Sequence, residues 1–74
     1  MDKNKFYEQM AQILDAEEVK PENILKEFET WDSLAVLSVM AMADAKFGVA
    51  LKAEEMRSAV TAADLEKLLE AKTK

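Results

Sequence analysis

The sequence contains neither cysteine nor histidine, and each absence excludes a kind of chemistry. Without cysteine the chain forms no disulfide, and without either residue it lacks the ligands of the common zinc sites. The same absences remove the Ser-His and Cys-His pairs that activate a nucleophile. No residue pattern points to a carboxylate or a lysine tuned for acid–base catalysis near neutral pH. We therefore expect a protein that is not an enzyme and that binds no metal ion.

Glycine and proline are also scarce, since each occurs once among the 74 residues. An all-β fold needs many turns, which favour these two residues, so their scarcity argues against that fold class. Alanine, leucine, glutamate, lysine and methionine dominate instead, and all five favour helices. With 50% hydrophobic and 34% charged residues, the composition is typical of a globular domain. The sequence predicts one small all-α domain, residues 1–74.

Basic side chains are in the minority, with 10 against 15 acidic ones and a net charge of −5. An acidic surface repels nucleic acids and anionic lipids, and it complements a basic patch on a protein partner. The first ten residues are polar, unlike a signal peptide, and the apolar stretch 34–43 is too short to span a bilayer. We expect a cytoplasmic monomer that binds other proteins, without nucleic acid and without membrane insertion.

Apolar spacing and capping residues predict four helical segments: 3–16, 33–47, 53–57 and a last one that begins after Thr61. Pro21 stops the first helix, and Gly48 ends the second in a left-handed conformation. Thr61 and Asp64 resemble a capping box for the last helix. The connection between the first two helices is long enough to let them run roughly parallel. The simplest assembly is a four-helix bundle with three main helices, a short third helix and a long first loop.

The second predicted helix carries no charge between Leu34 and Ala43. A surface helix needs one apolar stripe, whereas this helix is apolar on most of its circumference. It is therefore the central helix of the bundle, or part of it is an exposed docking surface. We expect its exposed positions to include Ala35, Ser38, Val39, Met42 and Ala45. Asp44 is the only acidic residue among the positions expected on this face.

An Asp-Ser pair, Asp32 and Ser33, stands directly at the start of this helix. The serine could be a helix cap, an enzyme nucleophile or a site to which a group is attached. Capping is the commonest role of both residue types before a helix. A nucleophile is a poor interpretation, because the chain lacks histidine and a Gly-x-Ser-x-Gly motif.

The run Trp31-Asp32-Ser33-Leu34 at the start of an apolar helix resembles the acyl carrier protein family, whose signature is Asp-Ser-Leu at the start of the second helix. The long preceding loop, Phe47-Gly48 at the end of the second helix, the short third helix and the capped last helix also match. The resemblance implies that Ser33 receives 4′-phosphopantetheine from coenzyme A. It further implies that Asp32 engages the transferase and its metal ion, and that Leu34 offers an apolar contact. Capping remains the alternative for Asp32, and core packing remains the alternative for Leu34.

The function implied by this resemblance is to hold acyl groups as thioesters for enzymes of fatty acid, polyketide or related specialised biosynthesis. The partners would be a phosphopantetheinyl transferase and the enzymes that load and process the acyl group. One alternative is an aminoacyl carrier, either peptidyl or D-alanyl. Another is an unmodified helical interaction module in which Ser33 only caps the helix.

The chain departs from the family pattern at two places. Thr30 stands where the family often has glycine, and Trp31 precedes the aspartate. We expect Trp31 to anchor the loop by packing on the core. The second helix also has few acidic residues, so we expect partner docking to depend more on apolar contact than in fatty-acid-type carriers.

Overall fold

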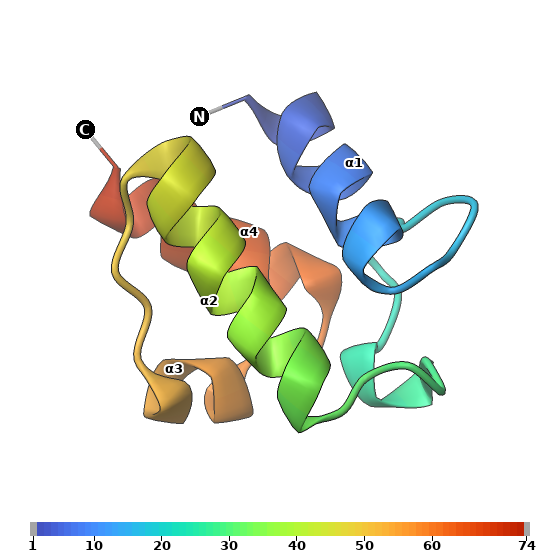
Figure 1. The fold of residues 1–74 in the computed structure, drawn as a ribbon. Helices are drawn as coiled ribbons and strands as arrows, with labels where there is room; N and C mark the ends of the chain where they lie inside the picture. The colour runs from blue at the N-terminus through green and yellow to red at the C-terminus, as the bar shows by residue number, and fades with distance from the viewer. Residues whose placement is uncertain (1, 74) are drawn as a thin grey trace.

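The computed structural model describes residues 2–73, which form four α-helices around an apolar core (Figure 1). The helices are α1 (Lys3–Ile13), α2 (Ser33–Phe47), α3 (Ala53–Ser58) and α4 (Ala62–Lys72), with a short 3₁₀ helix, η1 (Leu25–Glu27), in the first loop. The predicted all-α bundle, with three main helices and a short third helix, is confirmed. Met1 and Lys74, the ends of the expected domain 1–74, lie outside the described residues.

The core receives side chains from all four helices and from the links between them. Its largest fully buried members are Phe6, Met10, Leu14, Leu25, Val39, Val49, Leu65 and Leu69. Burying a side chain of this size contributes about 1.5–3 kcal/mol relative to leaving it exposed. No helix formed by residues 2–73 combines the length and the apolar composition that crossing a bilayer requires.

The first helix is shorter than predicted, because it ends at Ile13 and not near residue 16. Asp15 adopts a left-handed conformation, with φ of 52°. Its N–H donates to the Gln12 carbonyl at 3.3 Å, and the Ala16 N–H donates to the Ala11 carbonyl at 2.9 Å. This pair of bonds closes the helix in the manner of a Schellman motif, with aspartate where glycine is usual. Because aspartate is less usual than glycine in this conformation, the sequence does not predict that the helix ends here.

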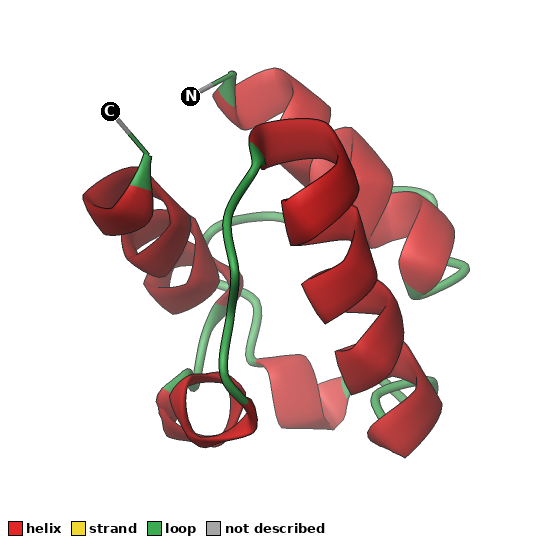
Figure 2. Ribbon diagram, turned by 60° about the vertical axis from the view of Figure 1, so that its left-hand side comes forward, coloured by secondary structure: helices red, strands yellow, loops and turns green. Residues whose placement is uncertain are grey.

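α1 runs in the opposite direction to α2 and α4, so the expected parallel arrangement of the first two helices is wrong (Figures 1 and 2). Thr30, just before α2, donates from its hydroxyl to the carbonyl of Leu14 at the end of α1, at 2.7 Å. Lys3 at the start of α1 lies 3.7 Å from a carboxylate oxygen of Glu70, near the end of α4. The long loop therefore turns back at one end of the bundle instead of crossing its length.

The loop between α1 and α2 is fixed to the start of α4. Three backbone hydrogen bonds join the two segments: Leu25 N–H to the Val60 carbonyl at 2.9 Å, Ala62 N–H to the Asn23 carbonyl at 3.0 Å, and Ala63 N–H to the Pro21 carbonyl at 3.0 Å. Ile24 and Thr61 also form an isolated β-bridge. Because its backbone groups have partners, this loop is an ordered part of the fold.

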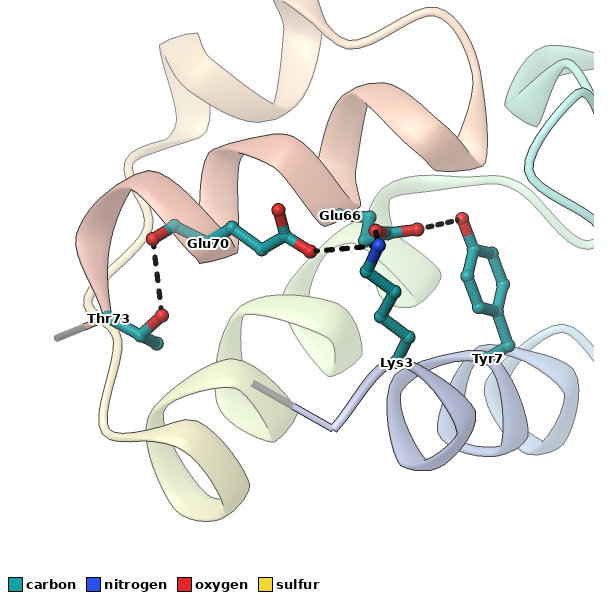
Figure 3. Close-up of polar contacts among 5 residues, drawn as sticks. All are labelled: Lys3, Tyr7, Glu66, Glu70 and Thr73. Carbon is teal, nitrogen blue, oxygen red and sulfur yellow. Dashed lines mark hydrogen bonds and ion pairs between the residues drawn. The ribbon is translucent and has the colours of Figure 1, made fainter.

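A polar cluster joins α1 to α4 on one side of the molecule (Figure 3). The Tyr7 hydroxyl donates to Glu66 Oε1 at 2.6 Å, and Lys3 Nζ lies 3.5 Å from Glu66 Oε2. Only 9% of the Glu66 surface is exposed. The hydrogen bond from Tyr7, helped by the Lys3 ammonium, holds the pKa of the Glu66 carboxyl below its ordinary value. The charged form of Glu66 therefore stabilises the folded state.

Gly48 ends α2 in the left-handed conformation that was predicted, with φ of 66°. Its N–H donates to the Asp44 carbonyl at 3.1 Å, and the Val49 N–H donates to the Ala43 carbonyl at 3.1 Å. A Cβ added at Gly48 would meet no atom within 4 Å. Any penalty for a side chain here therefore comes from the backbone conformation.

We predict that Gly48→Ala lowers the free energy of unfolding by about 1 kcal/mol, because alanine pays for a left-handed φ that glycine adopts freely. Gly48→Asn should lose less, since asparagine tolerates this conformation. Urea titration followed by circular dichroism measures both. Equal losses for the two variants would contradict the backbone explanation.

We also predict a link between Tyr7 and the acid sensitivity of the fold. A carboxyl whose pKa is lowered by folding contributes stability above its ordinary pKa, about 4.3 for glutamate, and loses it as the pH falls through the lowered value. Tyr7→Phe should cost about 2 kcal/mol at pH 7, because it removes a hydrogen bond to a charged group. The difference in the free energy of unfolding between wild type and Tyr7→Phe should become smaller below pH 4. Urea titrations at pH 7, 5, 4 and 3 measure it, and a gap independent of pH would contradict the assignment.

Candidate functional site

Asp32 and Ser33, at the start of α2, have different roles in the fold. Asp32 is the N-cap: its backbone is extended, and its Oδ1 accepts the Ala35 N–H at 2.9 Å. Ser33 is the first helical residue, and it is exposed. Its hydroxyl takes part in none of the side-chain hydrogen bonds formed among residues 2–73. The capping interpretation holds for Asp32, and it is the side chain of Asp32, not that of Ser33, that caps α2.

The position of Ser33 suits an attached anion. The first N–H groups of a helix have no partners within the helix, and the helix dipole places partial positive charge there. A phosphate group on the Ser33 oxygen would lie beside these groups. No cluster of three or more Asp and Glu side chains within residues 2–73 is arranged to hold a metal ion.

Leu34 points away from the core, so the core-packing interpretation of this residue is wrong. Leu34 is 72% exposed and Leu37 is 60% exposed. Ala41, one helical turn further on, is also exposed. We call Leu34, Leu37 and Ala41 the outer stripe of α2. It begins directly beside Ser33 and is free of charge along its length.

Three of the positions expected to be exposed on α2 are instead buried, namely Ala35, Val39 and Met42. Ser38 is half-buried, and only Ala45 of the predicted set is exposed. The expectation failed because the helix is apolar on most sides, so spacing alone does not say which side faces the core. The side of α2 that carries the outer stripe faces outwards, and the side that carries Ala35, Val39 and Met42 faces the core.

The segment that leads into α2 is held by its own side chains. Trp31 is half-buried and packs against the core, as predicted, and its N–H donates to the Phe28 carbonyl at 3.0 Å. The Thr30 hydroxyl bonds to the Leu14 carbonyl at 2.7 Å. Sequence reasoning missed this second contact, because nothing in the sequence pairs residues 30 and 14.

Glu55, an acidic residue of α3, is already engaged within the fold. Its Oε1 accepts the Lys52 N–H at 2.9 Å, and its Oε2 lies 3.0 Å from Lys72 Nζ. The bond from Lys52, followed by the Lys72 ammonium, lowers the pKa of the Glu55 carboxyl. Glu27, Glu29 and Asp32 remain as exposed acidic residues on the approach to α2.

We predict that Asp32→Ala lowers the free energy of unfolding by about 1 kcal/mol, because it removes the cap of α2. Asp32→Asn should stay close to wild type, since the amide oxygen can accept the same bond. Ser33→Ala should change stability by no more than about 0.5 kcal/mol. Thermal and urea unfolding of the three variants test this. A loss in Ser33→Ala as large as in Asp32→Ala would show that Ser33 shares the capping.

Comparison with known proteins leaves the family of this chain open. No protein-family model matches the sequence, and a search of curated proteins finds no significant match. The resemblance to acyl carrier proteins therefore rests on the Asp32-Ser33-Leu34 run and on the order of the helices around it.

Proposed function

We propose that this protein is a carrier that holds acyl groups as thioesters on a 4′-phosphopantetheine arm attached to Ser33. The observation that carries the proposal is the division of roles at the start of α2. Asp32 caps the helix through its side chain, and this leaves the Ser33 hydroxyl exposed and uncommitted. A serine whose only role was capping would spend its hydroxyl on a backbone N–H.

Attachment is a phosphoryl-group transfer in which Ser33 is the acceptor. Ser33 Oγ forms a bond to the phosphorus that carries pantetheine, and the bond from that phosphorus to the nucleotide part of coenzyme A breaks. Adenosine 3′,5′-bisphosphate leaves, and the hydroxyl proton passes to a base of the transferase. The new phosphodiester is an anion at the positive end of α2. The bound arm supplies a thiol, which a chain without cysteine lacks.

Asp32 and Leu34 flank the acceptor and present different chemistry to a transferase. Asp32 uses Oδ1 for the cap, and its Oδ2 has no hydrogen bond to residues 2–73. That oxygen is the one suited to the metal ion of the transferase. Leu34 offers an apolar contact on the other side of Ser33, where it is largely exposed.

The enzymes that load and process the acyl group would dock on the outer stripe of α2. Its leucines provide apolar contact, and the net charge of −5 attracts basic surfaces on approaching partners. We propose the cytoplasm as the place of action and a monomer as the acting form. Fatty acid, polyketide or related specialised biosynthesis is the proposed setting.

Two alternatives use the same fold. An aminoacyl carrier, peptidyl or D-alanyl, would keep Ser33 and its arm and differ in the partners it meets. An unmodified interaction module is favoured by the outer stripe alone, since Leu34 and Leu37 are exposed whether or not Ser33 is modified. Modification of Ser33 separates the carriers from the interaction module.

The test is to incubate the protein with coenzyme A, Mg²⁺ and a broad-specificity phosphopantetheinyl transferase, and then to measure its intact mass. We expect one phosphopantetheine adduct on wild type and none on Ser33→Ala. Ser38→Ala is the matched control, because it removes another α2 serine and should leave the adduct intact. An unmodified wild type, with a transferase that modifies a known carrier in the same assay, would refute the proposal.

A further inference from the structure

We propose that Thr30 is a positioning residue, which holds the segment Trp31–Ser33 so that the Ser33 hydroxyl meets the transferase in a fixed place. This inference rests on the proposed carrier function. It begins from the Thr30 hydroxyl, which donates to the Leu14 carbonyl at 2.7 Å. Thr30 stands where the resembling family often has glycine, which has no side chain to make such a bond.

The Leu14 carbonyl, which accepts the Thr30 hydroxyl, is not used by the hydrogen bonds that end α1. Around the end of α1, the carbonyls of residues 10, 11 and 12 accept from the N–H groups of residues 14, 16 and 15. The Leu14 carbonyl lies beyond these bonds and receives the Thr30 hydroxyl instead. Because Leu14 is only 2% exposed, its backbone is anchored in the core. The bond therefore ties the loop to a rigid part of the molecule.

Hydrogen bonds hold the backbone between Thr30 and α2 at each residue. Trp31 donates its N–H to the Phe28 carbonyl at 3.0 Å. Asp32 is held from the other side, since its carbonyl accepts the Val36 N–H at 3.0 Å and its Oδ1 accepts the Ala35 N–H at 2.9 Å. Ser33 lies three residues after Thr30, a span of about 10 Å at most. The anchor at Thr30 thus limits where the first residue of α2 can move.

Loss of the hydrogen bond from Thr30 should weaken binding of the carrier to the transferase and leave the rate of the chemical step unchanged. A loosened segment has to become ordered when the transferase binds it, so part of the binding free energy is lost. Once bound, the Ser33 hydroxyl is placed by the enzyme, and the rate of transfer is unchanged. A raised KM for the carrier at constant kcat is the signature of this role.

The test compares Thr30→Val, which keeps the shape and removes the hydroxyl, with Thr30→Ser, which keeps the hydroxyl. We expect Thr30→Val to raise the KM of the carrier for the transferase about three- to tenfold, with kcat within about twofold of wild type. Thr30→Ser should restore the wild-type KM. Rescue by serine separates the hydrogen bond from side-chain packing.

Thr73 provides the matched control. Its hydroxyl donates to the Glu70 carbonyl at 3.2 Å, the same kind of bond at the end of α4 (Figure 3). That end lies at the opposite side of the bundle from the start of α2 (Figure 1). Thr73→Val should leave the KM unchanged. An equal rise in Thr73→Val, or no rise in Thr30→Val, overturns the proposal.

Amide hydrogen exchange tests the same role without a transferase. Thr30→Val should speed exchange at Trp31 and Ala35 severalfold, whereas Thr30→Ser and Thr73→Val should leave it unchanged. If wild type accepts no phosphopantetheine, the carrier function fails, and exchange alone decides whether Thr30 holds this segment. Wild-type exchange rates in Thr30→Val would then refute the positioning role as well.

Discussion

The hydrogen bond from the Ala35 N–H to Asp32 Oδ1 decides where α2 begins, and much of the molecule depends on that choice. With the cap at Asp32, Ser33 becomes the first helical residue and keeps its hydroxyl free. Side chains follow one another at about 100° per residue along the helix, so its residues point to different sides. Ala35, Val39 and Met42 then enter the core, and Leu34 and Leu37 face solvent. The bond thus leaves the Ser33 hydroxyl free, at the start of the helix whose outward side carries Leu34 and Leu37.

α2 combines two tasks that most small helices divide. The side that carries Ala35, Val39 and Ala43 is buried in the core, whereas Leu34 and Leu37 remain exposed. Leucine side chains that remain exposed do not stabilise the folded state, so stability does not explain their position on this helix. A surface that partners cover in turn would supply one, and it would bring each partner to the Ser33 hydroxyl. The polar contacts that tie α1 to α4 involve none of the residues of the outer stripe.

Local signals in the sequence predicted the parts of the fold that local chemistry controls. The bounds of α2, the left-handed Gly48 and the Thr61–Asp64 capping box all follow from short motifs with a direct physical cause. The sequence could not predict the end of α1, because Asp15 is an uncommon residue for a left-handed stop.

Features that depend on distant parts of the chain were beyond local reasoning. The buried side of α2 is chosen by its neighbours, since apolar residues occur on almost every side of the helix. The direction of α1 depends on contacts such as the bond between Thr30 and Leu14, which joins residues 16 positions apart. The engagement of Glu55 by Lys72 likewise joins α3 to the last turn of α4. Each of these required the whole fold to be in place.

The attachment of the first loop to the start of α4 has a consequence for the order of events during synthesis. Pro21, Asn23 and Leu25 find their backbone partners in residues 60–63, which the ribosome makes well after Ser33. A growing chain would expose the serine before the loop that leads to it has its final shape. The loop that leads to Ser33 is therefore completed only when the start of α4 has been made, and a product that stops before α4 would carry the Asp-Ser-Leu run without its folded surroundings.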